Sequence, residues 1–236
     1  MMVLSCGRRE APRARAGTPV DSGRTASAAG ESSPNAAARR HRILIIGTSL
    51  TAGYGLEDPD QSYPADLQRR IDSLGLSYQV VNAGVSGETS AGALRGLDWW
   101  LREPADIVII ETGANDGLRG LSVDSMRANI QAIIDRVKAR DPRARIVLAG
   151  MEAPPNMGPR YTAAFRSVFP DLARRNGATL IPFLLAGVAG VDTLNQADGI
   201  HPNARGAELV AANVWRVLGP MLEASTAGAG EHAGAR

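Results

Sequence analysis

The sequence predicts an α/β fold in which a five-stranded parallel sheet lies between two layers of helices. Two observations indicate this fold. The chain contains five short apolar blocks rich in Ile and Val, which are typical of strands buried on both faces. A stretch with helical spacing of apolar residues follows each block, and such repeats of strand then helix are typical of a parallel sheet with right-handed crossovers.

The elements are expected in a regular order along the chain. The apolar blocks predict strands at Ile43–Ile46, Tyr78–Val81, Ile107–Ile110, Ile146–Ala149 and Ala178–Ile181. The helices are expected near residues 61–74, 89–101, 122–140, 160–176 and 203–219. Pro142 and Gly177 are the kind of residue that follows the end of a helix. Because the strands are parallel, their carboxyl ends meet at one edge of the sheet, where the chemistry of such folds gathers.

A single folded domain is expected over residues 41–222. Residues 1–40 consist mainly of Ala, Arg, Ser, Gly and Pro, so they cannot offset the entropy of ordering, and we predict a disordered arm. Its first residues, MVLSCGRR, resemble the end of a bacterial lipoprotein signal before Cys6, but the apolar region of such a signal is missing. Residues 223–236, EASTAGAGEHAGAR, are expected to form a flexible tail.

Composition excludes several classes of function. The net charge is +2, and residues 1–40 alone carry seven Arg against three acidic residues, so the basic character belongs to the arm and does not indicate nucleic-acid binding. No apolar run approaches the roughly 18 residues of a membrane-spanning helix. Cys6 is the only cysteine, which excludes an intramolecular disulfide and a cysteine-based metal site. Only His201 of the three histidines lies within the body of the domain, so we expect neither a metal nor a cofactor.

Small and hydroxyl-bearing residues follow the first three strands and precede the last helix. These four segments should meet at one edge of the sheet. In order along the chain they read GTSLTAGYG, NAGVSGETS, ETGANDGLRG and QADGIHPN.

Ser49 in the first segment is the candidate nucleophile, because a hydroxyl at the end of a buried strand is held firmly and still faces solvent. A serine of ordinary pKa needs a general base, and His201 is the histidine placed to serve as one. Asp198, three residues earlier, can accept the Nδ1 proton of His201 and fix its tautomer. DGIHPN also has a purely structural interpretation, as an Asp-Gly turn in which Pro202 begins the final helix.

Acyl transfer also needs hydrogen-bond donors for the developing oxyanion. The candidates are the N–H of Ser49, the N–H of Gly87 and the side-chain amide of Asn115. NDG could mark a hairpin turn, but a helical pattern and not a second strand follows it. VSGET could equally be a flexible glycine loop or a helix start capped by Ser86.

The four segments together resemble the SGNH (GDSL) hydrolase family. The resemblance rests on Ser49 within GTSL, Gly87 within NAGVSGETS, Asn115 within GANDGLRG, and Asp198 and His201 within DGIHPN. It covers about residues 42–222 and is greatest to the bacterial arylesterase, thioesterase I and lysophospholipase L1 group. It implies a flavodoxin-like three-layer α/β/α sandwich, a triad of Ser49, Asp198 and His201, and oxyanion donors from Ser49, Gly87 and Asn115.

One position departs from the family's pattern. Thr48 stands where the GDSL motif has an aspartate. That aspartate is not the triad acid, so the resemblance implies an intact mechanism with altered support of the loop that carries Ser49.

The expected function is hydrolysis of short to medium acyl esters, including aryl esters, with acyl thioesters and lysophospholipids as further substrates of the resembled group. The connections between strands are too short to form a helical lid, so the cleft should be open. We expect Leu118, Met157 and Tyr161 to form an apolar wall for the acyl chain. Each methylene contributes only about 0.8 kcal/mol on burial, so selection between neighbouring chain lengths should be shallow.

Two other functions are consistent with parts of the sequence. A carbohydrate acetylesterase of the same fold would use the same triad. A phosphate-binding module would hold its ligand on backbone N–H groups of GTSLTAGYG, but this loop has no Lys and lacks the Walker and dinucleotide spacings. That module would also leave Asp198 and His201 unexplained.

Partners and location follow from the same considerations. We expect a small acyl ester as the binding partner, no nucleic acid and a monomer. The resemblance favours the bacterial periplasm or envelope, and the chain as given is also compatible with the cytoplasm.

Overall fold

The sheet has five parallel strands in the order β2-β1-β3-β4-β5, in a computed structural model that describes residues 40–233, with side chains to residue 224. The strands are β1 (His41–Gly47), β2 (Tyr78–Gly84), β3 (Ile107–Ile110), β4 (Arg145–Ala149) and β5 (Thr179–Ile181). Every neighbouring pair is parallel, as the sequence predicts. The apolar residues of β1 and β3 are buried because both strands lie inside the sheet and are covered on both faces.

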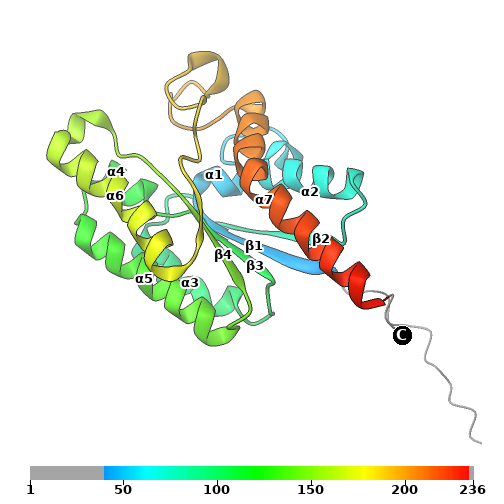
Figure 1. The fold of residues 1–236 in the computed structure, drawn as a ribbon. Coiled ribbons are helices and arrows are strands. Elements are labelled where there is room, and N and C mark those ends of the chain that lie inside the picture. Colours follow the sequence, from blue (N-terminus) through cyan, green and yellow to red (C-terminus); the bar gives the residue numbers. More distant parts are fainter. Residues whose placement is uncertain (1–39, 234–236) are drawn as a thin grey trace, which may run out of the picture. The chain divides into compact units, whose positions relative to one another are not determined.

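Helices cover both faces of the sheet (Figure 1). α2 (Tyr63–Ser73) and α7 (Ala204–Ala233) pack together on one face. α3 (Ser90–Trp100), α5 (Val123–Arg140) and α6 (Pro159–Asn176) pack side by side on the other. Local capping fixes several of these ends: Ser122 accepts a hydrogen bond from the Ser125 N–H before α5, and Gly177 ends α6 with a φ of 61°. The three-layer α/β/α arrangement predicted from the sequence is confirmed.

Two short helices occupy segments where loops are expected. α1 (Ser49–Ala52) begins immediately after β1, and α4 (Ala114–Leu118) begins shortly after β3. The remaining short elements are the 3₁₀ turns η1 (Pro59–Gln61), η2 (Pro155–Met157) and η3 (Asp192–Leu194). A helix of about one turn shows no hydrophobic periodicity, which explains why the sequence pattern does not reveal it.

The boundaries of the domain differ from expectation at one end. The final helix α7 continues to Ala233, beyond residue 222, where we expect a flexible tail. Alanine, the strongest helix former, is the commonest residue after position 222, and no proline follows there to end the helix. The predicted arm, with Cys6, lies outside the described residues except for Arg40. Among residues 40–233, no helix combines the length and the apolar character needed to cross a membrane.

The strand order indicates where on the sheet edge a ligand site is expected. From β1 the chain runs to β2 on one side and then crosses back to β3 on the other, so the order reverses at β1. Ligands bind such sheets outside the carboxyl ends of the strands at this switch point. Gly47 and Gly84 are paired at these ends, and a Cβ on Gly84 would lie 2.3 Å from the Ala52 nitrogen. The two glycines therefore let α1 pack directly against the strand ends.

Candidate active site

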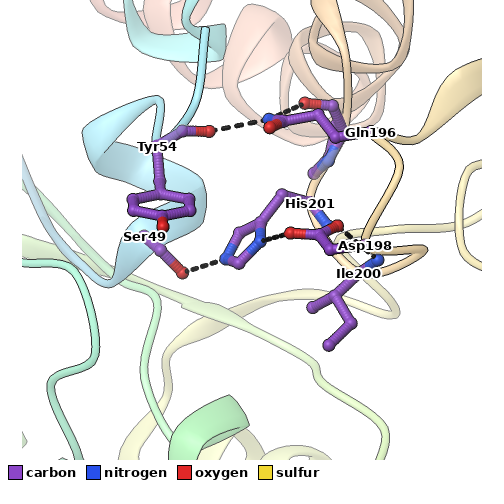
Figure 2. A network of polar contacts seen from close by, with 7 residues as sticks. Ser49, Tyr54, Gln196, Asp198, Ile200 and His201 are labelled. Atoms are coloured by element: carbon purple, nitrogen blue, oxygen red, sulfur yellow. Dashed lines mark hydrogen bonds and ion pairs between the residues drawn. The ribbon is translucent and has the colours of Figure 1, made fainter.

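Ser49, His201 and Asp198 form a continuous chain of polar contacts at this edge of the sheet. Ser49 is the first residue of α1, and its Oγ lies 2.9 Å from Nε2 of His201. Nδ1 of His201 lies 2.6 Å from Oδ2 of Asp198 (Figure 2). Ser49 and His201 are partly buried, whereas Asp198 is exposed. The structure thus brings together three residues that the sequence separates by up to 152 positions.

The turn before α7 holds Asp198 in place. Oδ1 of Asp198 accepts hydrogen bonds from the N–H of Ile200 at 2.9 Å and of His201 at 3.0 Å. Hydrogen bonds from the His201 backbone and, to a smaller extent, from the His201 side chain lower the pKa of Asp198 to about 2. An ionised carboxylate can only accept hydrogen bonds, so its contact with Nδ1 favours the tautomer of His201 that carries its proton there.

Gln196 ties the histidine turn to the serine turn. Its Nε2 donates to the backbone oxygen of Tyr54 at 2.7 Å and to that of Pro202 at 3.0 Å. A Cβ on Gly55 would lie 2.1 Å from Oε1 of Gln196, so only glycine allows this approach. Figure 2 shows Tyr54 beside His201, with ring centroids 4.8 Å apart. Nothing in the sequence pattern singles out Gln196 or Tyr54, because their importance arises from contacts between distant segments.

Asn115 and Gly87 lie in neighbouring segments beyond β3 and β2. Nδ2 of Asn115 donates to the backbone oxygen of Glu88 at 2.9 Å, which fixes the orientation of the amide. A primary amide carries two N–H groups, so a second donor is left for a substrate. Gly87 has a φ of 78°, and its carbonyl accepts a hydrogen bond from Arg119 at 2.8 Å. These contacts hold the loop with Gly87 against the start of α4.

Two buried carboxyl groups support the site without being evident from the sequence. Asp116 binds the N–H of Ser90 at 2.8 Å and its hydroxyl at 2.6 Å, which joins α4 to the start of α3. Glu111, directly after β3, is hydrogen-bonded to Thr48 and Thr51 on either side of Ser49. In the sequence, each reads only as a polar residue in a strand-end loop.

A cavity of about 430 Å³ opens beside Ser49, Asn115 and His201. Its apolar lining comes from Leu118, Met151, Pro154, Pro155, Phe183, Leu185 and Ile200, with others. Leu118, one of the three residues predicted to form an apolar wall, is among these lining residues. Met157 and Tyr161 line a separate hollow at the start of α6, together with Val123 and Gly158. Pro154 and Pro155, at the start of the turn η2 (Pro155–Met157), line the cavity beside Ser49, whereas Met157 at its end lines the other hollow.

Two further observations concern other kinds of site. A larger cavity, of about 630 Å³, lies around the first residues of β1 and the segment before β4, and its lining includes none of Ser49, Gly87, Asn115, Asp198 and His201. Within residues 40–233, His, Cys, Asp and Glu side chains do not gather in groups of three that could hold a metal ion.

Comparison with known proteins agrees with the fold and the motifs. The model of the GDSL-like Lipase/Acylhydrolase family matches residues 45–209. Esterase TesA of Pseudomonas aeruginosa is 43% identical over 182 residues, which cover 76% of this chain and 89% of that protein. Thioesterase 1/protease 1/lysophospholipase L1 of Escherichia coli K12 is 34% identical over 187 residues, covering 79% and 87%.

A solved structure is similar throughout the domain. The crystal structure of the psychrotrophic esterase EstA from Pseudoalteromonas sp., inhibited by monoethylphosphonate, matches with a TM-score of 0.73 and 36% sequence identity. The match covers 78% of this chain and 99% of EstA. The family match includes the segments that carry Ser49, Asn115 and His201. The chain therefore belongs to the GDSL-like lipase/acylhydrolase family.

Proposed function

We propose that this carboxylic ester hydrolase, which is of the TesA type, cleaves short to medium acyl esters through an acyl-enzyme intermediate on Ser49. The observation that carries the proposal is the unbroken contact from Ser49 Oγ through His201 to Asp198. A serine hydroxyl becomes a nucleophile when a base takes its proton, and this geometry supplies both the base and the group that orients it.

The reaction proceeds in two halves. Ser49 Oγ attacks the acyl carbon while His201 Nε2 takes the serine proton, and the ester bond breaks as that proton passes to the leaving alcohol. Water then attacks the acyl-enzyme with His201 again as the base, which releases the acid and restores Ser49. Asp198 remains ionised throughout and stabilises the imidazolium form of His201.

The negative oxygen of each tetrahedral intermediate needs donors already in position. Three groups are proposed for this role: the N–H of Ser49, the N–H of Gly87 and the second N–H of Asn115. The Ser49 N–H is at the first position of α1, where no preceding turn offers it an acceptor. The bond between Asn115 and the Glu88 oxygen supports the role of the amide, since it holds the group rigid before substrate arrives.

The cavity supports substrates with short to medium acyl chains. Its volume of about 430 Å³ and its lining of Leu, Met, Pro, Phe and Ile side chains suit an apolar group without directional contacts. Aryl esters, acyl thioesters and lysophospholipids share this acyl portion, and the names of the similar thioesterase and lysophospholipase from Escherichia coli support testing them.

A rate panel with a serine-directed probe tests the proposal. Ser49→Ala and His201→Ala should each abolish hydrolysis of aryl butyrates by several orders of magnitude, with Asp198→Asn less damaging because that residue acts through orientation. A fluorophosphonate should label the native protein and not Ser49→Ala. Ser167→Ala, on α6, is the matched control and should be labelled like the native protein.

Two results would contradict the proposal. Substantial turnover by purified Ser49→Ala protein would remove Ser49 from the nucleophile role. Strict dependence on one acetylated sugar, with no activity on aryl or thio esters, would replace the proposed substrate class by a carbohydrate acetylesterase.

A further inference from the structure

The carboxyl group of Glu111 lies beneath the turn that carries Ser49 and is completely buried. Its Oε2 accepts hydrogen bonds from the Thr48 N–H at 2.7 Å and from the Thr51 hydroxyl at 2.8 Å. Its Oε1 accepts one from the Thr48 hydroxyl at 2.9 Å. The donors belong to the residue directly before Ser49 and to the residue two positions after it. The Glu111 side chain is therefore hydrogen-bonded to the chain on both sides of the candidate nucleophile.

The packing around this carboxyl group leaves little space. A Cβ on Gly47 would lie 2.8 Å from Oε2 of Glu111 and 1.9 Å from Oγ1 of Thr51. The Thr51 Oγ1 lies 2.6 Å from the hydroxyl oxygen of Tyr63 on α2, which extends the contact to the opposite side of the turn. The arrangement is therefore specific to these residues, because a larger residue at position 47 would displace it.

We propose that Glu111 is a positioning residue for Ser49, whose ionised carboxylate holds the serine turn in its active geometry and whose protonation loosens that turn. The inference rests on the proposed function, since it takes Ser49 as the nucleophile. It adds a second proton, besides the one on His201, that governs activity.

The hydrogen-bond arrangement distinguishes the two charge states of Glu111. An ionised carboxylate only accepts hydrogen bonds, and all three groups that contact it can donate. A protonated carboxyl group must donate from one oxygen, and the Thr48 N–H cannot reverse to accept. Hydrogen bonds to an ionised group are roughly twice as strong as neutral ones, so protonation weakens those that remain.

The charge of Glu111 changes in the working range of an esterase. Burial raises its pKa to about 7, and the hydrogen bonds from Thr48 and Thr51 oppose this rise. The other titratable group in the cluster is Tyr63 of α2. Burial, followed by the charge of Glu111, raises the pKa of Tyr63 well above its usual value. Tyr63 therefore stays neutral, and Glu111 is the group in this cluster that binds and releases a proton near pH 7.

Glu111→Gln tests the proposal, because glutamine has nearly the same shape and stands for the protonated state. We would measure kcat and KM for p-nitrophenyl butyrate from pH 5 to 9 in the native protein, in Glu111→Gln, and in Glu57→Gln. Glu57 is an exposed residue beyond α1 and supplies the matched control for a Glu-to-Gln change. Any loss of activity caused by protonation of His201 occurs in all three proteins and cancels in their ratios.

The expected result is a ratio of native to Glu111→Gln activity that depends on pH. At pH 8 to 9 the variant should lose about tenfold in kcat/KM, mainly in kcat, as for weakening a hydrogen bond to a charged group. Near pH 5 the ratio should approach 1, because the native side chain is then also neutral. The ratio of native to Glu57→Gln should stay near 1 throughout. A native to Glu111→Gln ratio that is constant with pH would overturn the proposal, since loss of packing alone does not titrate.

A second variant covers the case in which Glu111→Gln fails to fold. Thr48→Asp restores the residue of the family motif and places a second carboxylate within hydrogen-bond distance of Glu111. Two carboxylates in one site retain a proton to higher pH, so the acid limb of kcat/KM should move upward by at least half a pH unit, an order-of-magnitude expectation. An unchanged acid limb would refute the role of Glu111, whereas activity retained by Ser49→Ala would instead refute the proposed function.

Discussion

Replacing Glu111 with glutamine should also change how the free energy of unfolding depends on pH. In the unfolded chain the Glu111 carboxyl group has an ordinary pKa of 4.5, and in the folded protein burial raises that pKa to about 7. A raised carboxyl pKa means that the folded state binds the proton more tightly than the unfolded state does. The resulting stability is fully present below pH 4.5 and is lost as the pH rises through about 7.

The magnitude follows from the two pKa values. A rise from 4.5 to about 7, at about 1.4 kcal/mol per pH unit, corresponds to about 3 kcal/mol of unfolding free energy. Most of this, about 2 to 3 kcal/mol, should be lost between pH 5 and 8. Glutamine does not titrate, so Glu111→Gln lacks this loss while every other ionisable group keeps its contribution.

Urea unfolding of both proteins at half-unit steps from pH 5 to 8 measures the difference. The free energy of unfolding of the native protein should fall relative to that of Glu111→Gln by about 2 to 3 kcal/mol over this range. Glu57→Gln should run parallel to the native protein. Parallel curves for the native protein and Glu111→Gln would refute the reasoning, because they would show that Glu111 binds its proton equally well in the folded and unfolded states.

Three further outcomes test other parts of the site. Asn115→Ala should lower kcat by about 10² or more with little change in KM, because the proposed bond from its amide strengthens only as negative charge develops on the substrate oxygen in the transition state. A change in KM alone would make Asn115 a ground-state contact. Gln196→Leu should lower kcat about tenfold through loss of the hydrogen bonds to the backbone oxygens of Tyr54 and Pro202. Unchanged kinetics would show that the turn that carries His201 keeps its geometry without Gln196. Leu118→Ala should alter the preference among butyrate, hexanoate and octanoate esters, whereas Met157→Ala should not, since of these two residues Leu118 alone lines the cavity beside Ser49. Equal effects of the two substitutions would contradict that assignment.

The sequence pattern predicts the sheet well because its signal is local and strong. Strands such as Ile43–Ile46 and Ile107–Ile110 are continuous apolar runs, and each occurs where expected. The parallel arrangement then brings the loops after β1 and β3 to one edge of the sheet, so the proximity of Ser49 and Asn115 could be expected before any coordinates. Their catalytic roles remain predictions that the kinetics above address.

What the sequence does not reveal depends on tertiary contacts. Glu111 follows an apolar strand and reads as the first polar residue of a loop, yet it is completely buried. Only the packed structure shows that Thr48 and Thr51 turn their hydroxyl groups toward it. Met157 illustrates the reverse case: the composition of its loop predicts a wall for the acyl group, but Met157 lines a separate hollow at the start of α6.

The two consequences of the Glu111 proton act in opposite directions. Protonation favours the folded state, because it removes a charge from a buried site, but it takes an acceptor from the turn that positions Ser49. The ionised form costs stability and gives the firmer serine geometry, as strained or charged groups at functional sites often do. If both effects arise from one proton, kcat must rise around the same pH, about 7, at which the fall in unfolding free energy levels off. Thr48 favours the ionised form, because its hydroxyl stabilises the carboxylate where an aspartate would oppose ionisation.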